Sequence, residues 1–324
     1  MSAALILFAY AGLLAFAAPG LLSRGGWTAR APRLGIIAWQ MAAFSLLVSA
    51  ALIGFALVVP TVQVSADLAN LFRACVMALR DQYATPGGAA AAAVGAVLAL
   101  AVLARAAWCV TVSLAGALHG RARHRDVLTL VGVPAAHLGA VVVDSDEPAV
   151  HCLPGRRRRI VVTTGALRLL DDRQLAAALA HERAHLDQRH DLVLAWSGGL
   201  ARAFPRVRLF TRAHAETVRL VELLADDVAA RSADRLTLAE ALLTLAGSRT
   251  PAAALGAGGS TAAERVRRLI TPYPPLGHLR TALTSTGVAA LLALPLLGLA
   301  TPMAAAAHLH YCPPGTVAAA PTAR

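Results

Sequence analysis

The stretch LAHERAHLDQRH, residues 179–190, gathers three histidines and a glutamate in a chain that is otherwise rich in alanine, leucine and valine. His181, Glu182 and His185 fit the pattern H-E-x-x-H. On a helix, residues four apart lie one turn apart on the same face, so both imidazoles can bind one metal ion. Glu182 is then placed to accept a proton from a water molecule at that ion. The stretch therefore predicts a metal site carried by a helix.

The residues around the motif predict the fold that carries it. Asp171 or Asp172 can cap a helix that includes the motif, and the apolar stripe of this helix is Leu175, Ala178, Leu179 and Leu186. Upstream, β-branched runs at 139–146, 149–153 and 159–164 predict strands, with a Pro-Gly turn signal between the last two. Downstream, helices are expected at about 212–231 and 235–245. The expected class is α+β with a helical majority.

A third metal ligand is expected on the helix at 212–231. A catalytic zinc commonly has three protein ligands and one open position. Glu222 can complete the site, and Asp226, one turn later, can accept the outer N–H of a ligating histidine. His190 and His214 are expected on helix surfaces and Glu216 in solvent, although His214 and Glu216 are the next candidates for the third ligand.

The composition predicts a membrane protein. Hydrophobic residues make up 57% of the chain and charged residues 15%, and the mean hydropathy is +0.60. Segments 3–22, 34–59, 88–108 and 283–307 have about the 20 apolar residues that a membrane-spanning helix needs. A cleaved signal peptide, cut near Ala17 and Ala18, is the alternative for the first segment, although no arginine precedes its apolar run.

The arginines predict the orientation in a cell membrane. Loops rich in arginine stay in the cytoplasm. Only Arg73, Arg80 and Arg324 lie on one side of the spans. On the other side lie Arg24, Arg30, Arg33, Arg105, Arg121, Arg123, Arg125, Arg265, Arg267, Arg268 and Arg280. We therefore expect the N-terminus, the 60–87 loop and the C-terminal tail to be extracytoplasmic and the domain between the third and fourth spans to be cytoplasmic.

Three regions follow from these spans. We expect a membrane region with three transmembrane helices at 1–118, a cytoplasmic zinc metallopeptidase domain at 119–280, and a fourth transmembrane helix with a short tail at 281–324. The lipid bilayer is one expected partner. The net charge of +12 is explained by juxtamembrane loops, and direct nucleic-acid binding is not expected because aromatic and basic residues do not alternate. The sequence does not indicate an oligomeric state.

The motifs together resemble a known family. HERAH, the later VELLAD, the preceding PGRRRRIVVTTGAL and the four-span frame resemble the BlaR/MecR-type antirepressor membrane zinc metallopeptidases, which are related to the HtpX-like and CAAX prenyl proteases. The resemblance covers most of the chain and is densest at 139–226. It implies Zn²⁺ ligands at His181, His185 and Glu222, a general base at Glu182 and a supporting carboxylate at Asp226.

The chain departs from the family pattern at two places. In HtpX-like relatives a histidine and a proline precede an arginine after the glutamate helix. GSTAAERVRRL, residues 259–269, matches that arginine with Arg265 but lacks the histidine, so Arg265 is a candidate oxyanion or substrate contact. Only about 17 residues follow the last expected span, so the penicillin-binding sensor of the β-lactam-responsive members is not expected.

The resemblance implies an integral membrane zinc endopeptidase of the gluzincin type that cleaves a cytoplasmic protein, such as a winged-helix repressor, in a signalling pathway. The run AVHCL, residues 149–153, could hold the substrate backbone if it forms a sheet edge beside the site. The alternative is a non-catalytic membrane receptor or scaffold with a structural zinc site. Structural sites usually have four protein ligands and no use for a base such as Glu182, which disfavours this alternative.

The four cysteines test the topology. Cys109 and Cys152 fall at the inner interface and in the cytosol, where thiols stay reduced. Cys75 and Cys312 fall outside, and we expect a disulfide between them. The alternative is a buried Cys75 and a free Cys312.

Overall fold

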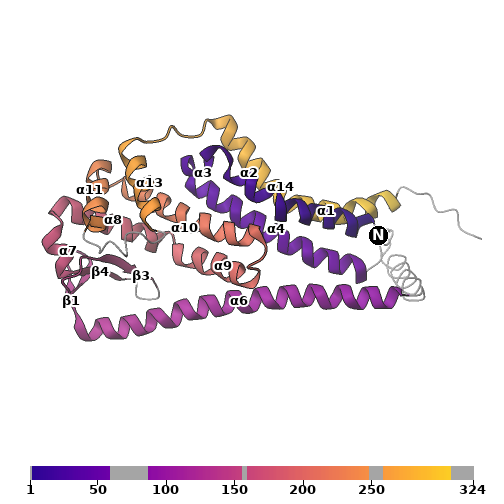
Figure 1. The fold of residues 1–324 in the computed structure, drawn as a ribbon, viewed down its shortest axis with the longest axis horizontal. Helices are drawn as coiled ribbons and strands as arrows, with labels where there is room; N and C mark the ends of the chain where they lie inside the picture. The colour runs from indigo at the N-terminus through magenta and orange to yellow at the C-terminus, as the bar shows by residue number, and fades with distance from the viewer. Residues whose placement is uncertain (1, 59–86, 155–158, 248–257, 308–324) are drawn as a thin grey trace, which may run out of the picture. The chain divides into compact units, whose positions relative to one another are not determined.

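The computed structural model describes residues 2–58, 87–154, 159–247 and 258–307 (Figure 1). Its internal contacts divide the chain into two units. The first unit consists of residues 1–11, 48–101 and 293–324, and the second of residues 12–47 and 102–292. Every residue predicted for the metal site therefore belongs to the second unit.

Four helical segments are long and apolar enough to cross a bilayer, which confirms the four expected candidate spans. They are Ala4–Arg30, Pro32–Val58, Gly88–His119 and His278–Leu297. The first contains α1 (Ser2–Phe16), α2 (Ala18–Ser23), the 3-10 turn η1 (Arg24–Gly26) and α3 (Trp27–Arg30), and the second is α4 (Pro32–Val58). The third lies in α6 (Gly88–Val131), which continues well past the expected end of that span, and the fourth lies in α14 (His278–Ala307).

Within the first unit, α4 and α6 approach closely at two glycines. A Cβ atom on Gly54 would lie 2.4 Å from Cβ of Ala99 and 2.7 Å from the carbonyl oxygen of Gly95. A Cβ atom on Gly95 would lie 2.8 Å from Cβ of Leu57. Small residues allow helix backbones to approach in this way, and the contact is of the kind that holds membrane helices together.

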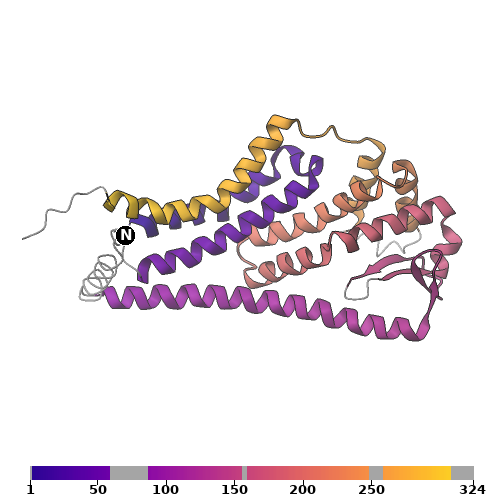
Figure 2. The same ribbon diagram turned by 180° about the vertical axis from the view of Figure 1, so that it is seen from behind.

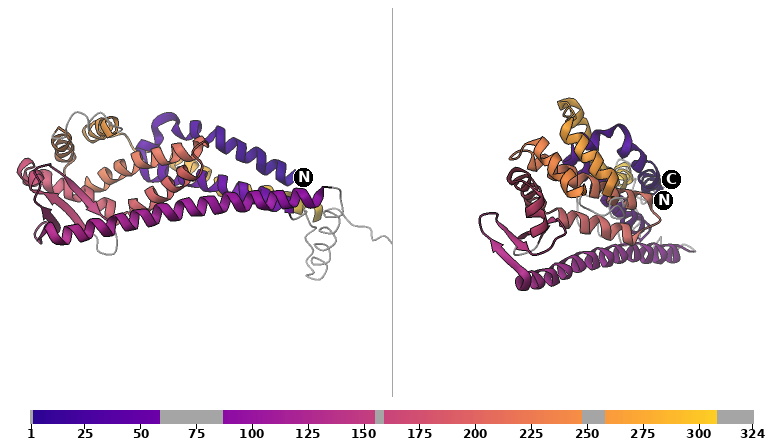
Figure 3. Two further views of the ribbon diagram at one scale, coloured as in Figure 1. Left: turned by 60° about the horizontal axis from the view of Figure 1, so that its bottom comes forward. Right: turned by 60° about the vertical axis from the view of Figure 1, so that its left-hand side comes forward.

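The second unit contains a small sheet of four strands, seen in the left view of Figure 3. The strands are β1 (Gly132–Ala135), β2 (Ala140–Val143), β3 (Val150–Leu153) and β4 (Arg159–Thr163), in the spatial order β1-β2-β4-β3. β1 and β2 are antiparallel, β2 and β4 are parallel, and β3 and β4 are antiparallel. The three predicted strands correspond to β2, β3 and β4, and β3 lies at an edge of this sheet.

Among the described residues, six helices of the second unit follow the sheet and precede α14. They are α7 (Thr164–Leu169), α8 (Asp172–Asp187), α9 (His190–Ala203), α10 (Arg208–Ala229), α11 (Arg235–Gly247) and α13 (Gly258–Ile270). α10 packs against both α8 and α9, and α11 packs against α8 and α13 (Figure 1, and from behind in Figure 2). α8, α10 and α13 thus bring together segments that are far apart in the sequence.

α8 starts where the sequence predicts. Asp171 is the N-cap: its carboxylate accepts a hydrogen bond from the Gln174 backbone N–H at 2.8 Å, and the Gln174 side chain accepts one from the Asp171 N–H at 3.3 Å. Such a capping box satisfies backbone donors that the first turn leaves without partners. The predicted apolar stripe is buried in one cluster with Ile160 and Val162 of β4, so this face of α8 packs on the sheet.

Polar and charged groups join the segments near the first two spans to α10 and α13. The Gln40 amide of α4 donates to the hydroxyl of Thr217, which is fully buried in α10, at 2.7 Å. Arg268 of α13, itself buried, donates to the carboxylate of Asp227 at 2.7 and 2.8 Å and to the carbonyl oxygen of Ala29 at 3.0 Å. α10 and α13 are therefore fixed to residues of the first two candidate spans.

Candidate metal centre

Two imidazoles of α8 and one carboxylate of α10 converge on one point. The Nε2 atoms of His181 and His185 are 3.0 Å apart. The Glu222 carboxylate oxygens lie 3.6 Å from Nε2 of His181 and 3.5 Å from Nε2 of His185. Among the described residues, these three form a group whose ligand atoms all lie within 4.8 Å of one another. The structure therefore brings together the three predicted ligands.

The spacing of these atoms suits zinc. Zinc binds histidine nitrogens at about 2.0–2.1 Å and carboxylate oxygens at a similar distance, so tetrahedral ligand atoms lie about 3.4 Å apart. The observed separations of 3.0, 3.5 and 3.6 Å bracket that value. Two nitrogens and one carboxylate also form a donor set that zinc prefers, and three ligands leave a position open. The residues present fit a catalytic zinc ion.

Asp226 and Arg265 lie behind the ligands. An Asp226 oxygen lies 3.0 Å from Nδ1 of His181, and the Asp226 residue is only 1% exposed. Arg265 donates to both Asp226 oxygens at 2.8 Å and lies 2.9 Å from an oxygen of Glu222. Asp226 is thus placed to fix the tautomer of His181, as predicted. The Arg265 guanidinium pairs with the carboxylates of Glu222 and Asp226 and so neutralises part of their negative charge.

The charges of the site shift the pKa values of its members. Burial alone would lower the pKa of His181, but its hydrogen bonds to Asp226 and Glu222 outweigh burial and raise the pKa to about 9. Burial and the charge of His181 lower the pKa of His185 to about 4. Burial opposes the ionisation of Glu222, yet a hydrogen bond to His181 and the charge of Arg265 lower its pKa to about 2. Burial also opposes the ionisation of Asp226, yet hydrogen bonds to Arg265 and His181 lower its pKa to about 2. Both carboxylates are therefore ionised at neutral pH.

Glu182 lies between the ligands and the edge of the sheet. Its carboxylate accepts hydrogen bonds from the thiol and the backbone N–H of Cys152, on β3. Burial raises the pKa of Glu182 above its ordinary value. Burial and the negative charge of Glu182 in turn raise the pKa of the Cys152 thiol, which stays protonated. A carboxylate with a raised pKa beside a metal position is suited to general acid–base chemistry.

The prediction that His190 lies on a helix surface is wrong. His190 is 3% exposed, and its Nδ1 lies 3.0 Å from Nδ1 of His185. α8 ends at Asp187 and α9 begins at His190, so His190 lies at a break between two helices. The polar run Asp-Gln-Arg at 187–189, after the last apolar residue of the stripe, is the signal that could have indicated this break.

The two reserve candidates for the third ligand bind elsewhere. His214 is half-buried, and its Nδ1 lies 3.0 Å from the hydroxyl oxygen of Ser197. Glu216 was expected in solvent, but it accepts a hydrogen bond from Arg219 at 3.1 Å. Cys109 and Cys152 are free thiols. Cys75 and Cys312 lie outside the described residues, so their pairing stays a prediction.

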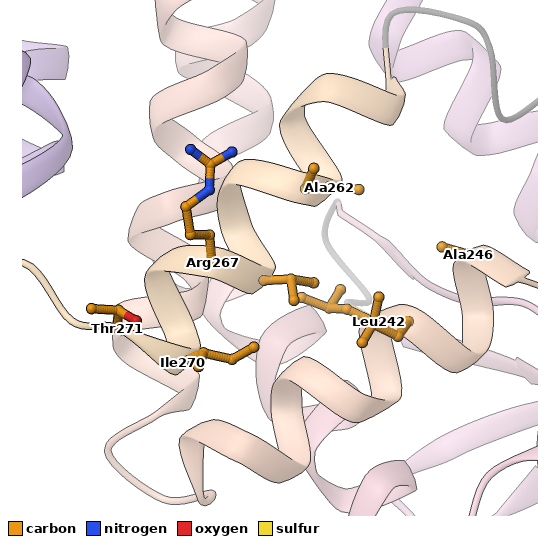
Figure 4. A pocket seen from close by; sticks show the side chains of 9 residues that line it. Leu242, Ala246, Ala262, Arg267, Ile270 and Thr271 are labelled. Atoms are coloured by element: carbon orange, nitrogen blue, oxygen red, sulfur yellow. The ribbon is translucent and has the colours of Figure 1, made fainter.

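A separate hollow lies between α11 and α13. Its volume is about 530 Å³. Figure 4 shows that its side chains are mostly apolar and that the guanidinium of Arg267 points away from Leu242 and Ile270. Its lining contains Leu242, Leu243, Ala246, Ala262, Ala263, Val266, Arg267, Ile270 and Thr271. It offers no histidine, cysteine or carboxylate, so the metal chemistry belongs to the α8–α10 group.

Comparison with known proteins supports a metallopeptidase. Residues 121–205, about a quarter of the chain, match the sequence model of Peptidase family M48. Peptidases of this family are zinc metallopeptidases, and the family covers HtpX-, BlaR- and CAAX-protease-like enzymes. The match includes all of α8 but ends before α10 and α13. No curated protein and no solved structure matches the chain. The match and the four apolar helices are consistent with a membrane metallopeptidase.

Proposed function

We propose that the protein is a membrane-embedded zinc endopeptidase of the gluzincin type that cleaves a cytoplasmic protein in a signalling pathway. The observation that carries the proposal is the convergence of His181, His185 and Glu222, with Glu182 beside them and Asp226 behind them. The family match supports the peptidase class. A small winged-helix repressor is the substrate class that the resemblance to BlaR/MecR-type enzymes implies.

The residues divide the reaction between them. His181, His185 and Glu222 would hold a zinc ion. When bound, zinc lowers the pKa of a water molecule toward about 7 and polarises the substrate carbonyl. Glu182 accepts a proton from the attacking water and passes it to the nitrogen of the leaving amine. Its raised pKa favours the first of these transfers, because a more basic carboxylate takes up the proton of the water more readily.

The sheet edge offers a place for the substrate backbone. β3 is the last strand in the sheet order and packs against α8. An extended peptide added to a strand edge is held mainly by backbone hydrogen bonds. A peptide that pairs with β3 would pass Glu182, because Cys152 of β3 contacts that carboxylate. We therefore place the scissile bond opposite Cys152.

The arginine distribution supports a cytoplasmic substrate. Eleven arginines flank the spans on the side of the α8–α10 group and three on the other. On this basis the peptidase domain faces the cytoplasm and both termini are extracytoplasmic.

The decisive experiment compares wild type with Glu182→Gln. The full-length proteins, purified in detergent and loaded with zinc, are incubated with casein and with candidate repressors, and the products are identified by mass spectrometry. Wild type should cleave, whereas Glu182→Gln should bind zinc equally but cleave at least about 100-fold more slowly. Equal cleavage by the two proteins would reject Glu182 as the base. Zinc binding without cleavage by wild type would favour the non-catalytic receptor or scaffold.

A further inference from the structure

His190 stands directly behind one of the proposed metal ligands. Its Nδ1 lies 3.0 Å from Nδ1 of His185, the ring nitrogen that does not face Glu222. We infer that His190 is a positioning residue: it accepts the Nδ1 proton of His185 and so directs the Nε2 lone pair of His185 toward the metal. The inference rests on the proposed metal site and extends it beyond the three ligands.

The break between α8 and α9 creates this contact. In a continuous helix, a residue five positions after His185 would point about 140° away from it around the axis. Instead, Gln188 caps α8 and Arg189 adopts φ 50° and ψ 44°. Among the described residues, Arg189 is the one non-glycine residue with a positive φ. This left-handed conformation is unfavourable for a residue with a Cβ atom. It turns the chain so that His190, the first residue of α9, contacts His185.

The short distance between the two Nδ1 atoms places a proton between the two histidines. The ring centroids are 4.9 Å apart and the rings are nearly perpendicular, at 88°. Two nitrogens 3.0 Å apart with no cation between them cannot both present lone pairs, so one of them carries a proton. If Nε2 of His185 offers its lone pair to a metal, the neutral ring carries its proton on Nδ1. His190 must then be the acceptor, with its own proton on Nε2.

The burial of His190 leaves one of its two ring nitrogens without a hydrogen-bond partner among the described residues. Its Nε2 atom is buried and has no partner among the described protein atoms. Burying a polar group without a partner costs free energy. A purely space-filling role at this helix junction would be met better by an apolar side chain. Among the described residues, the hydrogen-bond partner of this ring is His185.

The two histidine ligands consequently receive different support. An ionised carboxylate, Asp226, faces Nδ1 of His181, whereas a neutral ring faces Nδ1 of His185. Acceptors behind metal-ligating histidines fix ring orientation, and their loss typically weakens metal binding by about 10- to 100-fold. Removing the Nδ1 acceptor that His190 offers to His185 should weaken metal binding by the same factor.

The test uses metal binding and spectroscopy of the full-length protein in detergent. The variants are His190→Leu, which has no acceptor, His190→Asn, whose amide oxygen can replace Nδ1, and His190→Gln, whose amide lies one methylene farther out. His214→Leu is the matched control, because His214 contacts Ser197 and not a ligand. Zinc affinity is measured by competition with a chromophoric chelator, and the visible spectrum of the Co²⁺-substituted protein reports the ligand geometry.

His190→Leu and His190→Gln should bind zinc about 10- to 100-fold more weakly, with an altered Co²⁺ spectrum, and His190→Asn should recover most of the affinity. Wild-type affinity in His190→Leu, or equal weakening in His190→Asn and His190→Gln, would overturn the inference. If His190→Leu does not fold, the Asn and Gln pair decides the question. Absence of zinc binding by wild type would overturn the proposed function as well, so the two failures are distinguishable.

Discussion

An oxygen of Asp226 lies 3.0 Å from Nδ1 of His181, while Nε2 of the same imidazole faces His185 and Glu222. Asp226 is nearly inaccessible to solvent, and Arg265 donates to both of its oxygens. The carboxylate therefore cannot rotate freely. It holds the ring of His181 in the orientation that a metal requires.

This relationship predicts that Asp226→Asn weakens metal binding without removing a ligand. The amide keeps the shape of the side chain but carries no charge, so its attraction to the His181 N–H and to Arg265 is weaker. Zinc affinity should fall by about 10- to 100-fold, measured by chelator competition. Glu240→Gln, which removes one negative charge at an exposed site on α11, is the control. Equal affinities in the two variants would show that Asp226 does not support His181.

Glu222→Ala tests the third ligand itself. The variant removes the carboxylate that completes the group with His181 and His185, so the purified protein should lose most of its zinc while the membrane helices stay folded. Metal content by elemental analysis and helicity by circular dichroism measure the two effects. His214→Ala should retain its zinc. Full zinc occupancy in Glu222→Ala would mean that another residue closes the site.

Local patterns allowed much of this site to be predicted. The spacing of His181 and His185, the cap at Asp171 and the stripe that packs on β4 are all properties of one helix. β1 was not predicted, because its four residues include Gly132 and Pro134, which are unfavourable in strands. The parallel pairing of β2 with β4 also depends on tertiary structure.

The parts of the site that escaped prediction depend on contacts across helices. Arg265 was expected as a substrate or oxyanion contact, but its pairing with Glu222 and Asp226 needs α13 to pack beside α10. His190 was expected on a helix surface, but it is buried against His185. Its position depends on Arg189, which has a left-handed backbone conformation. Only glycine and, less often, asparagine or aspartate favour that conformation, so an arginine does not predict it.

Arg268 should be important for stability rather than for chemistry. Its guanidinium is buried against Asp227 and the Ala29 carbonyl, so Arg268→Met leaves both acceptors without their donor. We expect the free energy of unfolding to fall by about 2–3 kcal/mol, less than for a fully buried pair because the Asp227 side chain is 28% exposed. Thermal unfolding in detergent measures the effect. Arg267→Met, at an exposed position of the same helix, should change stability little, and similar losses in both variants would contradict this role.

Gly54 should tolerate no side chain. A Cβ atom there would approach Ala99 to 2.4 Å and the Gly95 carbonyl oxygen to 2.7 Å, so Gly54→Ala must push α4 and α6 apart. Overpacking of this kind typically costs about 1–3 kcal/mol. Gly116→Ala, in α6 where a Cβ atom meets nothing within 4 Å, should be neutral or stabilising because alanine favours helix. The melting temperatures of the two variants in detergent decide the matter, and equal values would contradict the close contact.

The orientation in the membrane decides which substrates can reach Glu182, and it predicts the behaviour of reporter fusions. If the arginine-rich side of the spans is cytoplasmic, a fusion point after Gly120 should give activity with a reporter that functions only in the cytoplasm. A fusion point after Arg324 should give activity with a reporter that functions only after export. Alkaline phosphatase is active only after export and the chosen fluorescent protein matures only in the cytoplasm, so the two reporters test each fusion point independently. The reverse pattern would place the peptidase domain outside the cytoplasm, where a winged-helix repressor would never meet it, and the proposed substrate class would have to be replaced by extracytoplasmic proteins.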